Sequence, residues 1–589
     1  MFGLFKRLFY YNEKQVTCTE STGKHLLVAA FDFGTTLSGY AFSFRNDPTK
    51  IQTNQAWIAG SESLLSLKTP TCVLLNPHNE CAAFGFEAEN KYLNLVVQGE
   101  HKSWMLFRRF KMLLHNNDGL NRKATVEDIT GKKMPAMKIF AMSIRYLRDH
   151  LVDALHKQVD AIQESDILYV ITVPAIWNDA AKRFMREAAL EAGLDNDRIK
   201  LALEPEAASI WCQNINTSIK TDLSKAGIQY MVVDLGGGTA DISVHEKNLD
   251  GTLKEIHKAS GGPWGGILVD RNFICWLTNI FGQAKMSKLR EEDMEDYISL
   301  LRQFENKKRT ITQDTDGLIT FRLPISLINI HDEAEKLTVN KKFEQMKIPN
   351  ALINDKLRVP ANIVRSWFSE SIEETIRRMT NLLSDSKMMN VSTILLVGGF
   401  GECKLVHDSV KREFRNKRII VPQEAGLAVL KGAVRFGHWP GLVTSRIVKY
   451  TYEFSSMSDY DANIHGIEKR VTLDCYGDEK VENRFLKIVS VNTEVNIGKP
   501  IKAPGYTYLQ INCDCVMAIY TSLEPNPVFV TDSECKKIGE IPLGYAKGKS
   551  KDENRIEVSF LFGDSELEVR VKILKDGSEI KKVIDFFDA

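Results

Sequence analysis

Apolar runs of strand length alternate with amphipathic stretches of helix length through most of the chain. Residues 27–44 form two β-rich runs around a Gly-Thr-Thr turn, and residues 166–173 form another run that ends before Pro174. A helix is predicted to begin at Asp179 and to end at Gly193. Further helical periodicity is found at about 138–158, 270–310 and 361–384. Alternating strands and helices predict an α/β fold.

The pattern changes near Gly441, after which the runs are β-rich and helical periodicity nearly disappears. We therefore expect a two-lobed α/β domain followed by a smaller β-sandwich-like domain. The predicted parts are a flexible N-terminal tail over 1–25, lobe I over 26–222, lobe II over 223–440, and a β-rich domain over 441–589. The charged segment 547–554 has no apolar anchor and is predicted to be a mobile loop.

Composition limits the possible functions. The 589 residues are 43% hydrophobic and 26% charged, with a net charge of +1, which favours a soluble protein and gives no general attraction for nucleic acid. No apolar run suggests a transmembrane segment or a signal peptide, so we expect a cytoplasmic protein, with weak surface anchoring by the tail as the alternative.

The cysteines are scattered, and Cys513 and Cys515 are interpreted as a strand pair rather than a metal site. A basic cluster, Arg108, Arg109 and Lys111, is interpreted as a solvated helix face.

Two glycine turns repeat one chemical plan at distant places in the chain. A strand leads to Asp32 and then Gly34, Thr35 and Thr36; a second strand leads to Asp234 and then Gly236, Gly237, Gly238 and Thr239. Backbone N–H groups in such turns can bind phosphate without side-chain bulk, and carboxylates at strand ends can hold a hydrated magnesium ion. Each turn alone is a weak signal, but the pair predicts a site that clamps ATP or ADP with Mg²⁺ from both sides. Gly398 and Gly399 supply a third turn, suited to pass beneath the adenosine.

Six segments, in this order, resemble the nucleotide-binding signatures of the 70-kDa heat-shock chaperones: FDFGTT, ITVPAIWND, EPEAA, DLGGGTADIS, LLVGGF and PQEAGLAVLKGA. The segments KTPT, FRRFKM and LFGDSELEV are similar to the divergent 12A/12B subfamily. The resemblance covers roughly residues 26–589 and implies an actin-like ATPase fold that binds ATP.

The resemblance implies roles for individual residues. Asp32 and Asp234 would orient a hydrated magnesium ion, and Thr35, Thr36 and Thr239 would contact phosphate. Glu204 would join the metal shell through water and help to place the attacking water, on which Asp241 would act. Pro174 would couple the domains. A structural role, such as a helix cap for Glu204 or a strand end for Pro174, is the alternative in each case.

Glu305, Lys308 and Arg309 lie three and four residues apart, so they share one face of a predicted helix. On residues alone, a solvated charged face is the simpler interpretation. The family uses such a trio to hold adenine and ribose, and the resemblance therefore implies nucleotide contact.

Several positions depart from the family pattern. In the comparison, Glu89 stands where the chaperones place a lysine that touches the transferred phosphate, and an acid there would repel phosphate. Lys91 is a candidate substitute. Phe400 and Glu402 replace a serine and an arginine after the third turn, so adenine is expected to stack differently. The segment GYAKGKS at 544–550 nearly spells a phosphate-binding loop but is one residue short, and we interpret it as an ordinary loop.

The C-terminal segments resemble the chaperones' peptide-binding β-sandwich more loosely. The family's helical lid has no counterpart before residue 589, so we expect clients to dissociate quickly. The leading hypothesis is a slow ATPase whose nucleotide state controls a β domain that binds proteins or peptides, with co-chaperone-type regulators. The alternative, motivated by Glu89, is a nucleotide-gated scaffold that does not hydrolyse ATP. A small-molecule kinase of the same superfamily and an actin-like filament former are less favoured, because neither gives the β domain a role.

Overall fold

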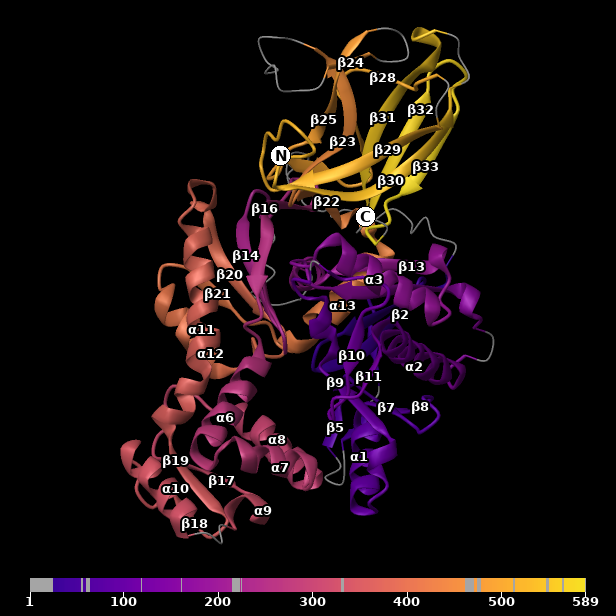
Figure 1. Cartoon of the computed structure of the whole chain (residues 1–589). Coiled ribbons are helices and arrows are strands. Elements are labelled where there is room, and N and C mark those ends of the chain that lie inside the picture. The colour runs from indigo at the N-terminus through magenta and orange to yellow at the C-terminus, as the bar shows by residue number, and fades with distance from the viewer. Residues whose placement is uncertain are drawn as a thin grey trace, which may run out of the picture.

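The computed structural model shows two α/β lobes beside each other with a β-rich domain above them (Figure 1). It describes residues 25–587 except 55–56, 60–63, 118, 160–161, 214–222, 224, 330–332, 461–470, 474–477, 512–513, 547–549 and 564–565. The predicted tail, apart from His25, lies outside the described residues, as do Cys513 and part of the predicted loop at 547–554. The remainder of that loop ends in a short 3₁₀ turn, η9 (Asp552–Asn554).

Lobe I is built on a mixed sheet in the order β13-β12-β1-β2-β3, with β6 beside β2. Every residue of β1 and β12 is buried, because helices cover both faces of the sheet. One face packs on α2 and α3, and the other on α4 and α13. The elements of this lobe are β1 (Leu27–Phe33), β2 (Leu37–Phe44), β3 (Gln52–Thr53), β4 (Trp57–Ala59), β5 (Leu64–Ser66), β6 (Thr69–Pro70), β7 (Cys72–Leu75), β8 (Cys81–Phe84), α1 (Gly85–Val97), η2 (His101–Ser103), β9 (Met105–Arg108), η3 (Phe110–Leu114), β10 (Thr125–Glu127), β11 (Lys133–Pro135), α2 (Ala136–His156), η4 (Glu164–Asp166), β12 (Ile167–Val173), α3 (Asp179–Glu191), η5 (Asn196–Arg198), β13 (Ile199–Leu203) and α4 (Glu204–Cys212).

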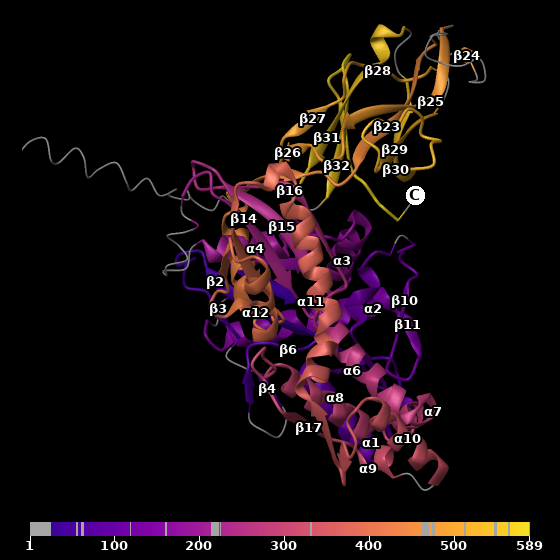
Figure 2. The same cartoon turned by 90° about the vertical axis from the view of Figure 1, so that its left-hand side faces the viewer.

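Lobe II repeats this plan with a sheet in the order β21-β20-β14-β15-β16-β22-β26. In Figure 2, the long helix α11 runs down this lobe. The helical region predicted at 270–310 is divided into three helices, and Gly282, at φ 87°, ends the first of them. The elements are β14 (Gln229–Leu235), β15 (Ala240–Lys247), β16 (Leu253–Gly262), α6 (Gly266–Phe281), α7 (Gln283–Glu291), α8 (Met294–Lys308), β17 (Leu318–Arg322), α9 (Ile325–Ile328), α10 (Glu333–Gln345), β18 (Leu352–Ile353), β19 (Lys356–Pro360), α11 (Ala361–Leu383), η6 (Ser386–Met388), β20 (Val391–Val397), α12 (Lys404–Glu413), β21 (Arg418–Ile420), η7 (Ala425–Leu427) and α13 (Ala428–His438).

The lobes share a buried core between their two sheets. Val28 and Ala30 of β1 and Tyr230 and Val232 of β14 belong to one buried cluster with α4 and α13. Because α13 follows the lobe II strands and packs on β1 of lobe I, the chain ties the two lobes together at their base.

The β-rich domain consists of two antiparallel sheets, in the orders β24-β25-β23-β29-β30 and β27-β31-β32-β33, with β28 beside β31. Their inner faces enclose a separate apolar core. Two strands beyond residue 441 do not belong to these sheets: β22 pairs with β16 and β26 pairs with β22, so both extend the sheet of lobe II. The elements are η8 (Pro440–Leu442), β22 (Val443–Ile447), β23 (Thr451–Asp459), β24 (Val471–Leu473), β25 (Glu479–Val489), β26 (Glu494–Asn496), β27 (Pro500–Lys502), β28 (Thr507–Tyr508), β29 (Asp514–Ser522), β30 (Cys535–Tyr545), β31 (Arg555–Phe562), β32 (Leu567–Ile573) and β33 (Glu579–Val583).

Candidate functional site

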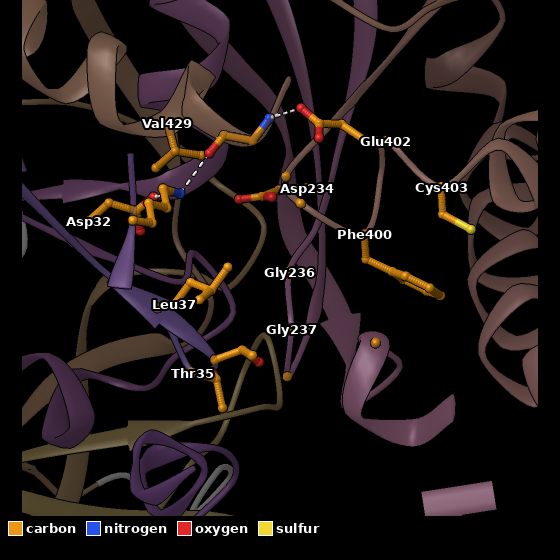
Figure 3. A pocket seen from close by; sticks show the side chains of 18 of the residues that line it. Asp32, Thr35, Leu37, Asp234, Gly236, Gly237, Phe400, Glu402, Cys403 and Val429 are labelled. Atoms are coloured by element: carbon orange, nitrogen blue, oxygen red, sulfur yellow. Dashed lines mark hydrogen bonds and ion pairs between the residues drawn. The ribbon is translucent and has the colours of Figure 1, made fainter. Parts of the chain in front are cut away.

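The two predicted glycine turns face each other across the space between the lobes. A Cβ atom added to Gly237 would lie 1.9 Å from Thr36 Oγ1, and one added to Gly238 would lie 2.7 Å from Thr35 Oγ1. Figure 3 shows Thr35 on one side of this space and the turn at Gly236 and Gly237 on the other. The absence of a Cβ at Gly237 and Gly238 therefore permits the approach of the two turns.

The backbone of each turn is fixed from behind. The carbonyl groups of Gly236 and Gly237 accept hydrogen bonds from the N–H groups of Gly266 and Ile267, at the start of α6. In lobe I, Thr71 donates its N–H to the Thr36 carbonyl and its hydroxyl to the Gly34 carbonyl. Since the carbonyl and N–H of one peptide unit point in opposite directions, the N–H groups that follow these carbonyls point away from the elements that support the turns.

A pocket of about 590 Å³ lies between the turns, within the range of small-molecule sites. It collects nearly all of the predicted site residues: Asp32, Gly34, Thr35, Thr36, Glu204, Asp234, Gly236, Gly237, Gly238, Thr239, Glu305, Lys308, Arg309, Gly398 and Gly399. Gly398, at φ 81°, passes so close to Asp234 that a Cβ there would lie 2.3 Å from Asp234 Oδ1.

Asp241 is the predicted site residue that does not line the pocket. It is buried beside Asp234 in the β14–β15 pair, and its Oδ1 accepts the N–H of Ile176 at 2.9 Å while its Oδ2 accepts the hydroxyl of Thr239 at 3.0 Å. These bonds place Asp241 behind the site, where it holds Thr239 and the segment after Pro174.

Buried carboxylates make the pocket strongly acidic. Burial raises the pKa of Glu204 to about 7; the Lys111 ammonium opposes this rise, and Asp241 and Asp32 add to it. Burial also raises the pKa of Asp234 well above its ordinary value, with further contributions from the neighbouring carboxylates. Such a concentration of negative charge favours a bound cation.

The geometry fits a hydrated ion better than a directly ligated one. Within the described part of the chain, no three Asp, Glu, His or Cys side chains converge closely enough to ligate one metal ion. Asp32, Glu204 and Asp234 nevertheless line one pocket, and the buried hydroxyl of Thr36 has no hydrogen-bond partner among the described residues. Magnesium keeps much of its water shell in proteins, so these groups fit Mg²⁺ held partly through water.

Two lysines of the pocket were missed by the sequence-based prediction. Lys68 lies 2.6 Å from Asp32 Oδ2, and Lys111 lies 2.9 Å from Glu204 Oε1 and 5.1 Å from the centre of the Trp177 ring. The interpretation of Lys111 as part of a solvated helix face is wrong: it is buried in the short turn η3, where Glu204 offsets its charge. Its neighbours Arg108 and Arg109 form ion pairs with Glu89 and Asp270.

The expected repulsion between Glu89 and phosphate is also wrong. Glu89 does not line the pocket; it is buried on α1, and its carboxylate binds Arg108 of lobe I at 3.0 Å and Arg302 of lobe II at 2.9 Å. Lys91 does not replace a phosphate lysine either, because its ammonium lies over the ring of Trp104. Glu89 therefore connects the lobes, and Lys68 and Lys111 bring positive charge to the pocket.

The predicted base-binding trio also lines the pocket. Glu305 binds Arg309 at 2.8 Å and Lys308, and Lys308 also reaches Asp270 at 2.6 Å. Asp270 in turn binds Arg109 of lobe I at 2.7 Å, so a chain of ion pairs runs from the pocket across to the other lobe.

Residues after the third turn also line the pocket. Phe400 lines the pocket and stacks on Phe368, with ring centres 6.4 Å apart. Glu402 accepts the N–H of Gly426 at 2.8 Å (Figure 3). An aromatic ring and a carboxylate are therefore available to a base where the family pattern has a serine and an arginine.

The β-rich domain contacts the site from behind. Lys449, which is partly buried, donates to the carbonyls of Ala175 and Trp177, which flank the residue held by Asp241. Arg446 forms a bidentate ion pair with Glu206 of α4, at 2.6 and 2.7 Å. Through these contacts, the segment after Pro174 lies between the pocket and the β-rich domain.

Comparison with known proteins agrees with this architecture. A model of the Hsp70 protein family matches residues 92–438, and the chain belongs to this family, with its actin-like ATPase fold and a C-terminal antiparallel β region. Among curated proteins, the chain is similar to Heat shock 70 kDa protein 12B of Homo sapiens, with 30% identity over 95% of this chain and 91% of the relative. It is also 31% identical to Heat shock 70 kDa protein 12A of Mus musculus, over 96% of this chain and 92% of that protein.

Among the helices that the structure describes, none has the length and hydropathy needed to cross a bilayer.

Proposed function

We propose that the chain binds ATP and ADP with magnesium in this pocket and hydrolyses ATP slowly. The observation that carries the proposal is the convergence of two opposed glycine turns, three carboxylates and the Glu305–Lys308–Arg309 trio on one pocket. Family membership supports it independently, because nucleotide binding is implied by the family.

In this proposal the N–H groups of the turns bind the phosphates, and Thr35 and Thr239 add hydroxyl groups. Asp32 and Asp234 hold the water shell of magnesium, which when bound offsets the charge of the phosphates. Glu204 positions a water molecule, and Lys111, held against it, stabilises negative charge that develops on the transferred phosphate. Because two lysines line the pocket and Glu89 does not, the chief reason for preferring a non-hydrolysing scaffold is lost.

We further propose that the nucleotide state controls partner binding by the β-rich domain. The support is the contact chain from Thr239 through Asp241 and Ile176 to the carbonyls that Lys449 binds. A shift of β15 when nucleotide binds would move the segment after Pro174 and change how the β-rich domain packs against the lobes. The resemblance of the domain to a peptide-binding sandwich suggests proteins or extended peptides as partners, bound in a groove or at a sheet edge.

Calorimetry with Mg-ATP and Mg-ADP tests binding. The wild type should bind both, and Asp32→Ala should bind at least about tenfold more weakly, as expected for loss of a charged contact. Absence of binding by the wild type would refute the proposal. Single-turnover hydrolysis then separates an enzyme from a scaffold: equal rates for the wild type and Asp234→Asn, with binding retained, would leave only the scaffold.

A further inference from the structure

Lys68 occupies a special place in the pocket because it binds one of the two carboxylates assigned to the metal. Its ammonium lies 2.6 Å from Asp32 Oδ2 and 2.6 Å from the carbonyl oxygen of Gly426, on the short turn η7 that precedes α13. The other oxygen of Asp32 is 3.4 Å from the hydroxyl of Thr172. Both carboxylate oxygens of Asp32 therefore have partners within the protein.

The position of Lys68 is built into the fold. A Cβ atom at Gly39 would lie 2.9 Å from Lys68 Cγ and 3.1 Å from the Leu67 carbonyl oxygen, so the lysine stem crosses β2 where the strand has no side chain. Ser66 Oγ holds the Lys68 backbone, donating to its carbonyl and accepting from its N–H. The next residue, Thr69, pairs with Ser38 of β2. These contacts direct the ammonium to Asp32.

The Lys68 ammonium and a hydrated magnesium ion require the same acceptor. Both are positively charged and both donate hydrogen bonds, the ion through its waters, so they cannot share Asp32 Oδ2 without strong repulsion. A metal ion that arrives alone must displace Lys68 from a short, mostly buried ion pair. A metal ion that arrives with phosphate brings anionic oxygens to which the flexible lysine can turn.

We propose that Lys68 is a counter-ion that makes the site accept magnesium together with nucleotide phosphate and reject free divalent cations. This inference rests on the proposed nucleotide function. When Mg-nucleotide binds, Lys68 moves from Asp32 to a phosphate oxygen. The Gly426 carbonyl loses its hydrogen bond from Lys68 at the same time. Binding of Mg-nucleotide therefore changes a contact of η7, which precedes α13, the helix that connects both lobes.

Titration of the full chain with Mn²⁺, without nucleotide, tests the inference, because free Mn²⁺ can be counted by electron paramagnetic resonance. Lys68→Gln should bind Mn²⁺ at least about tenfold more tightly than the wild type, since it loses one charge-assisted contact that competes with the ion. Lys68→Arg keeps the charge and should stay near the wild type. Lys431→Gln is the matched control, because the Lys431 side chain is about as exposed as that of Lys68 and its ion pair with Glu424, which also lines the pocket, does not involve Asp32.

Mg-ADP calorimetry on the same proteins distinguishes the two proposals. If the wild type binds no Mg-ADP, the proposed function fails. If it binds Mg-ADP but Lys68→Gln shows no gain in Mn²⁺ affinity over the wild type, including the case in which neither binds Mn²⁺ alone, the counter-ion role is overturned. An equal gain in Lys431→Gln would also overturn it, since the effect would then follow from net charge. Melting temperatures verify that each variant is folded.

Discussion

Adding one methyl group at Gly237 should weaken nucleotide binding by separating the two glycine turns. In Gly237→Ala the new Cβ would lie 1.9 Å from Thr36 Oγ1 and 2.7 Å from Thr36 Cβ, whereas real Cβ contacts are essentially never under 3.0 Å. The opposed turns must therefore move apart by about 1 Å, a displacement that commonly costs two orders of magnitude in function. Overpacking of this kind costs about 1–3 kcal/mol, so we expect the Kd for Mg-ADP to rise about 10- to 100-fold.

Gly236→Ala is the control, because its Cβ would meet only the Thr239 carbonyl oxygen, at an ordinary 3.5 Å. Calorimetry with Mg-ADP should give a Kd within about threefold of the wild type for this variant, since its Cβ makes no protein contact closer than an ordinary van der Waals distance and leaves the two turns in place. The reasoning is refuted if Gly237→Ala binds as tightly as Gly236→Ala, or if both lose affinity equally. Melting curves without nucleotide show whether the loss reflects the turns alone or the whole fold.

Three further predictions concern charged groups. Arg302→Gln, which removes the lobe II partner of Glu89, should release a fluorescent ADP analogue several-fold faster in stopped flow, whereas Arg271→Gln, which removes an exposed pair within lobe II, should not; equal rates for the two variants would contradict the lobe-to-lobe role. Lys111→Met should lower single-turnover ATP hydrolysis about 10²- to 10³-fold with little change in Mg-ADP affinity, and an unchanged rate would exclude Lys111 from charge stabilisation. Burial lowers the pKa of Lys449 from 10.5 to about 7, so between these values the unfolded chain binds one proton more at this residue and stability should rise with pH. Relative to Lys449→Met, the wild type should therefore melt at a higher temperature at pH 9 than at pH 7.5, and a constant difference would argue against the shift.

The two glycine turns and the pocket they share could be predicted because their sequence pattern is local. Asp32 and Asp234 each precede a glycine turn by a few residues, and the strands on either side are marked by apolar runs that become β1, β2, β14 and β15. Such a sequence pattern determines the local backbone geometry, since a strand that enters a tight turn fixes where the next N–H groups point. Because the same turn occurs twice in the chain, the sequence also predicts that the two turns face each other across one site.

The lysines and Glu89 could not be placed from sequence, because their partners are far away in the chain. Lys111 belongs to a run of basic residues, and only its contact with Glu204 distinguishes it from a solvated charge. The family comparison places Glu89 at a phosphate-binding position, whereas its ion pair depends on Arg302 in the other lobe. The segments KTPT and FRRFKM, which contain Lys68 and Lys111, indicate the family resemblance, but they do not indicate that these two lysines line the pocket.

The division near residue 441 shows a different limit of sequence reasoning. A change from helical to β-rich composition indicates a change of structure but does not say which sheet a strand joins. β22 and β26 do not differ in composition from the strands of the β-rich domain, yet β22 pairs with β16 and β26 pairs with β22, so both extend the sheet of lobe II. Strand pairing depends on edges that become available only in the folded protein.

The position of β22 has a mechanical consequence. As a strand of the lobe II sheet, it fastens the β-rich domain to that lobe, while Tyr452 and Glu566 fasten the same domain to α3 of lobe I. The domain therefore bridges both lobes on the side of the shared core, whose buried cluster includes Val443 of β22 together with α13. Because the domain is attached to both lobes, a rotation of one lobe relative to the other strains one of these attachments, so the free energy of opening the pocket and the free energy of freeing the domain are linked. A partner that pulls the domain from lobe I should, by the same linkage, loosen the grip on nucleotide.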